Sequence, residues 1–379
     1  MNANHLKIGF VRRGYSDGGG AEAYLKRLAE GLTGRGHEAQ LLSTEAWPAN
    51  EWLFGPIKRV GGATPLRFAD ALEELRAGSG CDVLMSLERV WQCDVYRAGD
   101  GVHRAWLQRR ARFDSAVRKV KSIFNQKHRG ILRLEESLFA HGGARHVIAN
   151  SAMVKREIVE LYGYPADEVH VVHNGVPAAV FACAAQAQRT SSRAALGLAS
   201  EEIAVLFVGS GWMRKGLRFA LRAIEACGIP QMRLLVAGKG NQAKHRSRRA
   251  QFLGVVTDLP ALYAAADIFL LPTLYDPFSN ACLEAMAAGL PVITTRANGF
   301  AEIVEEGKHG SVLDEPDDFM ALREALHFWS AQNRRGEARP EIQRRAAELD
   351  ISGNVARTLE VLLQAAANAE FTSGKIRNT

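Results

Sequence analysis

Two acidic residues, Asp276 and Glu284, lie eight positions apart in the segment 272–292, which reads PTLYDPFSNACLEAMAAGLPV. Asp276 is predicted on a loop, and Glu284 lies two turns later, inside a helix that is otherwise apolar. A carboxylate in such a helix costs free energy unless it is paired or bound by a ligand. The two hydroxyl groups of a ribose would satisfy it. The segment therefore predicts a ligand site, and the alternative is simple surface placement of both acids.

A second candidate site is the run Gly209–Gly216, with the sequence GSGWMRKG, predicted between a strand and a helix. Its basic pair, Arg214 and Lys215, meets a helix N-terminus. Backbone amides, helix dipole and cations there act on the same anion, which suits a diphosphate. The alternative is a solvated basic pair.

A third run, residues 14–22, reads GYSDGGGAE and follows the first predicted strand. Its Gly18 and Gly19 would let a ligand or another part of the chain approach the backbone closely. The run matches neither GxGxxG nor the phosphate-binding P-loop, and by itself it is equally consistent with a tight turn. The mismatch argues against a nicotinamide oxidoreductase.

Strands and helices alternate in both halves of the chain, and these elements must position the three runs. The apolar run 203–209 is typical of a strand covered on both faces. The alternation predicts an α/β fold with two Rossmann-like, doubly wound parallel sheets, whose ligands bind at the carboxyl ends of the strands. Periodicity is lost near residues 176–192, which predicts a boundary between two domains there.

The composition is that of an ordinary globular protein of 379 residues, 47% of them hydrophobic. No apolar run is long enough to span a membrane, and no signal peptide is evident, so we expect a cytoplasmic protein. The five cysteines are odd in number and lack metal-ligand spacing, so we expect neither disulfides nor a metal site.

The net charge of +7 is concentrated in the segment 104–133, which has ten Lys or Arg and one acid, Asp114. Apolar residues interleave with these cations at roughly helical spacing. An interfacial helix on an anionic membrane would have this pattern. A solvated helical face is the alternative, and no nucleic-acid motif supports the other basic-patch interpretation.

The segment 272–292 resembles the E-x7-E signature of the family 4 retaining glycosyltransferases, in which Glu-x-Phe-Gly precedes Leu-Glu-Ala-Met-Ala-x-Gly-x-Pro-Val. Here Asp276 replaces the first Glu and Ser279 the Gly. Residues 94–100, DVYRAGD, and the basic insertion after them resemble the glucosyltransferases of the lipopolysaccharide core. Other matching pieces are GGAE at 19–22, RGHE at 35–38, NS at 150–151, HNGV at 173–176, KG at 215–216 and AAAD at 264–267.

This resemblance implies the GT-B fold: an acceptor-side domain at residues 1–178, joined by a crossover helix at about 355–370, and a nucleotide-sugar domain at residues 179–354 that faces it across a cleft. It further implies transfer of a hexose, glucose in the nearest subfamily, from a UDP-linked donor to a lipopolysaccharide core or similar lipid-linked glycan at the inner face of the cytoplasmic membrane. No cofactor and no metal are implied. A non-catalytic nucleotide- or glycan-binding module on the same fold is the rival hypothesis.

Carried over residue by residue, the resemblance implies that Glu284 holds the ribose and Lys215 the diphosphate, with Arg214 as a helper. Asp276 would face the donor sugar. Asp100 is the expected acceptor-side catalytic residue, and His103 is the alternative. The remaining donor contacts would come from Gly18, Gly19, Val255, Phe278, Ser279 and Asn280.

Overall fold

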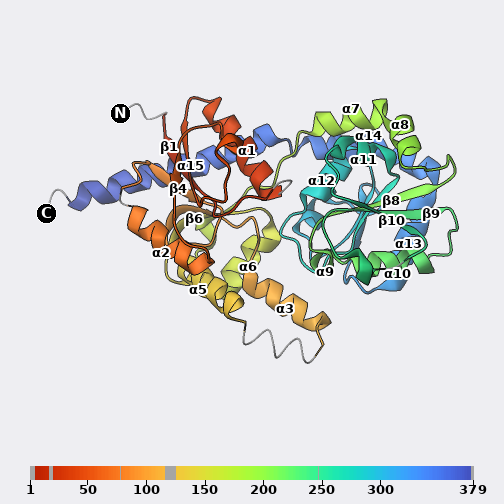
Figure 1. Ribbon diagram of the computed structural model, residues 1–379, viewed down its shortest axis with the longest axis horizontal. Coiled ribbons are helices and arrows are strands. Elements are labelled where there is room, and N and C mark those ends of the chain that lie inside the picture. The colour runs from red at the N-terminus through yellow and green to blue at the C-terminus, as the bar shows by residue number, and fades with distance from the viewer. Residues whose placement is uncertain (1–4, 17–19, 77, 116–124, 246, 377–379) are drawn as a thin grey trace. The chain divides into compact units, whose positions relative to one another are not determined.

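The computed structural model describes residues 5–16, 20–76, 78–115, 125–245 and 247–376. Gly18 and Gly19, together with three cations of the basic segment (Arg118, Lys119 and Lys121), lie outside the described residues. The chain forms two compact units. The N-terminal unit comprises Met1–His173 and Ile351–Thr379, and the C-terminal unit comprises Asn174–Asp350 (Figure 1).

Within its described residues, the N-terminal unit contains a seven-stranded sheet of order β3-β2-β1-β4-β5-β6-β7, and every pairing in it is parallel. The strands are β1 (Lys7–Val11), β2 (Glu38–Ser43), β3 (Ile57–Arg59), β4 (Val83–Ser86), β5 (Cys93–Arg97), β6 (Ala144–Ala149) and β7 (Val169–Val171). The helices are α1 (Gly20–Thr33), α2 (Pro65–Arg76), α3 (His103–Phe113), α5 (Gln126–Ala140), α6 (Ala152–Tyr162) and α15 (Ile351–Ile376), with short 3-10 turns η1 (Ala49–Glu51) and η2 (Ala166–Glu168).

The described part of the C-terminal unit contains a six-stranded parallel sheet of order β10-β9-β8-β11-β12-β13. The strands are β8 (Ile203–Val208), β9 (Met232–Ala237), β10 (Ala250–Gly254), β11 (Ile268–Leu271), β12 (Val292–Thr295) and β13 (Gly310–Leu313). The helices are α7 (Ala178–Ala187), α8 (Arg189–Ala195), α9 (Trp212–Lys215), α10 (Leu217–Ala226), α11 (Leu259–Ala265), α12 (Asn280–Ala287), α13 (Phe319–Ser330) and α14 (Gln332–Ala347), with turns η3 (Gln242–Lys244) and η4 (Gly299–Ile303).

The two sheets confirm the predicted α/β fold with doubly wound parallel sheets. Most of β8, β11 and β12 is fully buried, as expected for strands that are covered by helices on both faces. In both units the strand order reverses next to the first strand, β1 or β8, so the carboxyl ends of the strands there form the crevice at which doubly wound sheets bind ligands.

The segment 176–192 is not the irregular linker that its composition suggested. It forms α7 and the first half of α8, and Phe181 and Ala184 of α7 are buried. The Phe181 ring packs against the ring of Tyr263 in α11. The periodicity was hard to see in the sequence because alanine fills both the buried and the exposed positions of α7.

Helix α15 belongs to the N-terminal unit although it follows the C-terminal unit in the chain. Val355, Leu362 and Ala365 recur at helical spacing and are buried in the core of the N-terminal sheet, where α15 packs on β4, β5 and β6 (Figure 1). The Tyr24 hydroxyl donates to Asn354 Oδ1 at 3.0 Å, and Asn354 Nδ2 donates to the His173 carbonyl at 2.6 Å.

Candidate active site

Lys215 and Asp276 form an ion pair at the carboxyl edge of the C-terminal sheet. Lys215 follows β8 and Asp276 follows β11, and these two strands are neighbours in the sheet. The Lys215 stem crosses Gly209, where a Cβ atom would come within 3.4 Å of the lysine methylenes. Gly216 has φ +79°, and a Cβ there would lie 1.8 Å from the Pro272 carbonyl oxygen. Glycine at position 216 therefore allows the end of α9 to press against the loop that carries Asp276.

Arg214 fastens α9 to the same loop. Its carbonyl accepts hydrogen bonds from Leu274 N and Thr273 Oγ1, both at 2.8 Å. Its Nε donates to the Tyr275 carbonyl at 2.9 Å. The structure thus shows Arg214 holding the loop next to Asp276, whereas its contact with a diphosphate stays a prediction.

Glu284 lies inside α12 and is 9% exposed. The Tyr263 hydroxyl from α11 donates to Glu284 Oε2 at 3.0 Å. Burial, and then the Glu284 charge, raise the pKa of Tyr263 well above its ordinary value, so this hydroxyl stays protonated and serves as a donor. The Tyr263 hydroxyl therefore satisfies part of the hydrogen-bonding capacity of the Glu284 carboxylate. The sequence had suggested only ligand hydroxyls as its partners.

The loop between Asp276 and α12 is held by two buried asparagines that the sequence analysis did not single out. Asn174 Nδ2 donates to the Phe278 carbonyl at 3.2 Å and to Asn280 Oδ1 at 2.6 Å. Asn298 Oδ1 accepts from Ser279 N at 3.2 Å. The motif HNGV, which contains Asn174, was the available signal, but nothing in the sequence indicates which distant loop this amide would reach.

Several predicted donor contacts lie on or near this edge of the sheet. The Ser279 amide donates to Asn298 Oδ1 and so helps to hold the loop, whereas contact of Ser279 with a donor stays a prediction. The Ser279 side chain caps α12 by accepting from Cys282 N, and Asn280 is the first residue of that helix. Val255 follows β10 and is 56% exposed.

The acceptor-side candidates lie in the N-terminal unit, after β5. Asp100 is exposed on the turn that follows this strand. His103 begins α3, and its Nε2 lies 3.0 Å from His128 Nδ1. Burial, and next the Arg89 charge, lower the pKa of His103 to about 4, so its ring is neutral at pH 7. A group with this pKa is a weak general base at neutral pH.

Glu135, a fully buried carboxylate of α5, fixes the start of α3. It accepts hydrogen bonds from His103 N at 2.6 Å and Arg104 N at 3.0 Å, and it also forms an ion pair with Arg89 at 3.0 Å. Unpaired N–H groups at a helix N-terminus attract negative charge, and Glu135 supplies it here from inside the protein. The sequence gave no signal for this cap because it comes from another helix.

Glu22 of the motif GGAE pairs with Arg12 at the end of β1, with Nη2 and Oε1 3.0 Å apart. Arg12 also forms an ion pair with Glu88 at 3.3 Å. Burial alone would lower the pKa of Arg12, but Glu88, Asp100 and Glu22 together raise it. Two carboxylates, Glu22 and Glu88, therefore pair with one guanidinium at the carboxyl edge of this sheet, and the charge of the exposed Asp100 also acts on it.

Two family models match the chain in succession. The model described as Glycosyltransferase Family 4 matches residues 18–180, and the one described as Glycosyl transferases group 1 matches residues 202–330. The solved structure of WaaG, a glycosyltransferase involved in lipopolysaccharide biosynthesis, has a TM-score of 0.81 at 19% identity and covers 94% of this chain and 99% of its own. The chain has the GT-B fold, and each of its two units matches a glycosyltransferase family model.

Other relatives place this GT-B chain in a broad group. A structure of HepE from Anabaena in complex with UDP and glucose has a TM-score of 0.70 at 19% identity, covering 94% of this chain and 99% of its own. A probable transglycosylase of Burkholderia thailandensis is 28% identical over 96% of this chain and 98% of its own length. An uncharacterized glycosyltransferase of Methanocaldococcus jannaschii is 30% identical, but the match covers 43% of this chain and 45% of that protein. The chain thus spans about half the length of some of its curated relatives.

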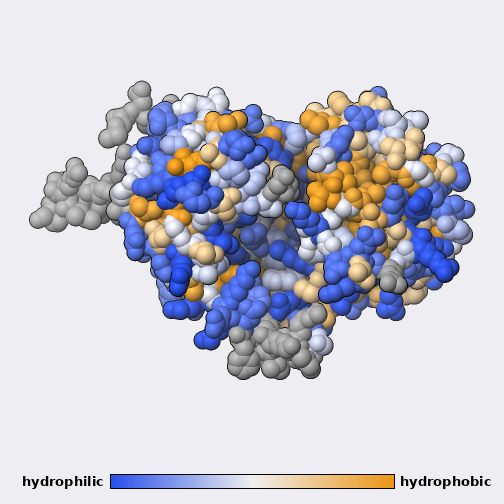
Figure 2. Space-filling model, viewed as in Figure 1, coloured by the Kyte–Doolittle hydropathy of each residue, from blue (hydrophilic) through white to orange (hydrophobic). Residues whose placement is uncertain are grey.

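The described part of this GT-B chain has no helix with both the length and the apolar character needed to cross a bilayer. In the basic segment, Arg104 lies over the ring of Tyr162, and Arg110 pairs with Asp114 at 2.9 Å. Four other cations of the segment are exposed, and Figure 2 shows hydrophilic surface with scattered apolar patches in the region of α3 and α5. These four are Arg112, Lys127, Arg129 and Arg133.

Proposed function

We propose that this chain transfers glucose from a UDP-linked donor to a lipopolysaccharide core or similar lipid-linked glycan, with retention of configuration and without a metal ion. The observation that carries the proposal is the placement of Lys215, Asp276 and Glu284 on the loops and helix that follow two neighbouring strands. This is the edge at which doubly wound sheets bind their ligands.

Each of these three groups has a distinct task in the proposed reaction. The Glu284 carboxylate accepts hydrogen bonds from the ribose hydroxyls, next to the hydroxyl of Tyr263. The Lys215 ammonium stabilises the negative charge that grows on the diphosphate as the bond to the sugar breaks. Asp276, held by Lys215, accepts from the hydroxyl groups of the donor sugar. Because Lys215 and the helix amides supply the positive charge, a divalent cation is dispensable.

The acceptor hydroxyl would be activated from the N-terminal unit. Asp100 is the better candidate of the two residues after β5, because it is exposed, whereas the His103 ring is already engaged with the His128 ring, with Nε2 and Nδ1 3.0 Å apart. The exposed cations around α3 and α5 would hold the enzyme at the inner face of the cytoplasmic membrane, where a lipid-linked acceptor is embedded.

The identities of the donor and the acceptor are the only parts of the proposal that are taken from relatives. HepE was solved with UDP and glucose, and WaaG is described as involved in lipopolysaccharide biosynthesis.

The full chain should be screened by thermal shift against UDP, GDP and ADP, and a ligand at 100 times its dissociation constant should stabilise it by about 2.7 kcal/mol. We expect UDP to give the largest shift.

Turnover is tested with UDP-glucose and a lipid-linked glycan, with and without excess EDTA. The expected result is release of UDP at the same rate in both samples at 20 °C, and a product with the anomeric configuration of the donor in its proton NMR spectrum. A strict requirement for magnesium or manganese would refute the metal-free mechanism. Binding of UDP without turnover or hydrolysis of any donor would instead indicate a non-catalytic module.

A further inference from the structure

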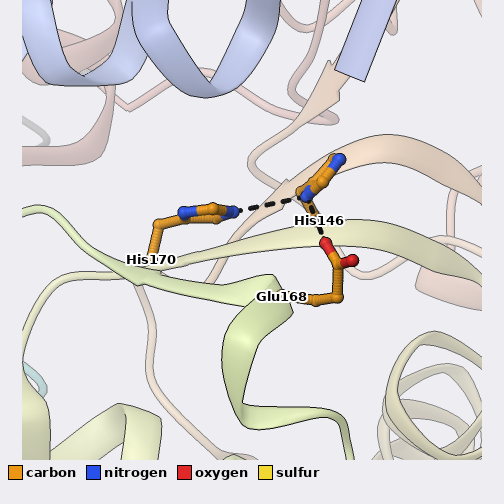
Figure 3. A group of neighbouring side chains, drawn as sticks. All are labelled: His146, Glu168 and His170. Atoms are coloured by element: carbon orange, nitrogen blue, oxygen red, sulfur yellow. Dashed lines mark hydrogen bonds and ion pairs between the residues drawn. The ribbon is translucent and has the colours of Figure 1, made fainter. Parts of the chain in front are cut away.

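Three side chains with metal-binding atoms converge in the N-terminal unit, apart from every residue used above. His146 lies in β6, Glu168 ends η2, and His170 lies in the edge strand β7. In Figure 3 the Glu168 carboxylate and the His170 Nε2 both point at the same atom, His146 Nδ1. Glu168 Oε2 lies 2.6 Å from His146 Nδ1, and His170 Nε2 lies 3.3 Å from it. The three ligand atoms all lie within 4.8 Å of one another.

The sheet fixes this arrangement through the backbone. His170 pairs with Ile148, and His146 is two residues before Ile148 in the same strand. Side chains two residues apart in a strand share a face of the sheet, so both imidazoles stand on one face. Glu168 comes from the turn directly before β7. His146 is buried, while the side chain of Glu168 is 38% exposed at the edge of the sheet.

Hydrogen bonding alone fits this cluster poorly. A ring nitrogen has one hydrogen or one lone pair, and therefore makes one good hydrogen bond. Two acceptor-capable atoms nevertheless approach His146 Nδ1 closely. An imidazole nitrogen that carries no hydrogen instead has a lone pair to offer. A cation between the three atoms would accept a lone pair from each of them.

We propose that His146, Glu168 and His170 bind one divalent transition-metal ion, with zinc as the best fit. Zinc takes imidazole nitrogen and carboxylate oxygen at about 2.0–2.2 Å in a tetrahedron, whose edges are then roughly 3.3 Å long. The separation of 3.3 Å between the two imidazole nitrogens matches such an edge. Glu168 Oε2 would withdraw from 2.6 Å to that distance, and a water molecule would complete the tetrahedron.

The proposed ion would join the edge strand β7 and the turn η2 to β6. Its ligands have no assigned role in sugar transfer, and its task would be to stabilise the N-terminal unit, to which all three belong. The proposal is therefore independent of the proposed function. It also uses none of the cysteines, whose spacing had suggested no metal site.

The test is isothermal titration of the untagged full chain, freed of metal by chelation, with zinc chloride at pH 7.5. Metal ions bind the deprotonated forms of these side chains, so the titration is run above neutral pH. We expect one zinc ion per chain, and no binding of magnesium, which prefers oxygen ligands. His170→Gln and Glu168→Gln should each weaken zinc binding at least tenfold, since each removes one of three protein ligands. His141→Gln, at an exposed histidine of the same unit, is the matched control and should leave the affinity within a factor of two.

A second measurement guards against misfolded variants. Zinc should raise the unfolding midpoint of the wild type and of His141→Gln, and it should leave that of His170→Gln where it was. The circular dichroism of His170→Gln without metal should match that of the metal-free wild type. If the wild type binds no zinc, or if His170→Gln and His141→Gln bind it alike, the proposed site is wrong.

Discussion

Lys215 and Asp276 are 61 residues apart in the chain, yet their side chains meet because β8 and β11 are adjacent in the C-terminal sheet. Asp276 is 5% exposed, and a buried carboxylate needs a partner. Lys215 therefore serves the fold as well as the proposed chemistry. A donor diphosphate would share the same ammonium group, so binding of the donor and the position of Asp276 are coupled.

Lys215→Ala should lower kcat roughly 100-fold and change the Michaelis constant much less. The charge matters most when the diphosphate departs, and loss of one such stabilising group costs about 100- to 1000-fold in rate. Steady-state kinetics with UDP-glucose measure this. The exposed Lys308→Ala is the control and should behave as the wild type.

The same substitution leaves Asp276 buried without its cation, which costs stability. Lys215→Ala/Asp276→Asn removes both charges, and we expect it to recover most of the unfolding midpoint and none of the turnover. If Lys215→Ala instead raises the Michaelis constant by about 100-fold and leaves kcat unchanged, Lys215 binds the donor and the transition state equally well.

Glu284→Gln should reduce kcat/KM for the donor about 10- to 100-fold. One or two charge-assisted hydrogen bonds to the ribose, at about 1.5–3 kcal/mol each, would be weakened. The fold should survive, because the amide oxygen of glutamine can still accept from the Tyr263 hydroxyl. Glu225→Gln, on the exposed end of α10, is the control. Wild-type kcat/KM in Glu284→Gln would refute the ribose assignment.

Asn174→Ala should weaken donor binding roughly tenfold without touching the donor itself. Its amide holds the Phe278 carbonyl and Asn280, and its loss frees the loop between Asp276 and α12. A net loss of about 1 kcal/mol per hydrogen bond also lowers the free energy of unfolding. Titration of UDP with the variant checks the first effect. If binding is unchanged while the unfolding midpoint falls, Asn174 has a purely structural role.

The stability of the N-terminal unit should fall as the pH drops from 6.5 toward 4, in part because of His103. Its pKa is lowered to about 4 in the folded state, so the unfolded chain binds a proton in this range that the folded chain does not. The contribution of His103 to the free energy of unfolding is therefore present above pH 6.5 and is lost as the pH falls toward 4. His103→Gln cannot take up this proton. Its unfolding free energy should therefore fall less between pH 6.5 and 4.5, by on the order of 1–2 kcal/mol after allowing for partial solvation of the ring. If the wild type and His103→Gln lose free energy of unfolding in parallel as the pH falls, in denaturant titrations, His103 is not the group responsible.

Replacing the four exposed cations around α3 and α5 with glutamine should release the protein from vesicles rich in anionic lipid. Each Lys or Arg near such a surface contributes about 1 kcal/mol, so partitioning should fall at least tenfold even if only half of them face the membrane. Wild-type binding should also fall steeply as salt rises from about 0.05 to 0.5 M, because the Debye length shortens. The substitutions are Arg112→Gln, Lys127→Gln, Arg129→Gln and Arg133→Gln.

A matched variant removes four exposed arginines of the C-terminal unit and has the same net charge. It carries Arg222→Gln, Arg248→Gln, Arg323→Gln and Arg334→Gln. It should still sediment with the vesicles, and both variants should hydrolyse the donor as the wild type does. Equal sedimentation of the two variants would mean that the basic segment is a solvated face or an acceptor-binding loop.

Sequence periodicity was sufficient to predict the alternation of strands and helices and the parallel sheets. The strands it did not reveal are mostly short ones or edge strands, such as β3, β7 and β13. β3 reads IKR and β7 reads VHV, and three residues with a polar centre carry no clear period. The local spacing of Asp276 and Glu284 was likewise enough to mark the candidate site, because both residues lie within one loop and one helix.

Which distant groups meet was decided only by the tertiary structure. Lys215 reaches Asp276, Tyr263 reaches Glu284, and His146 reaches His170 through strand order and helix packing, neither of which appears in local spacing. A sequence pattern indicates which face of an element is buried, because apolar residues recur on that face at the period of the helix or strand. The partner across the interface depends on long-range pairing of strands, and a carboxylate such as Glu135 finds its helix N-terminus only once the chain has folded.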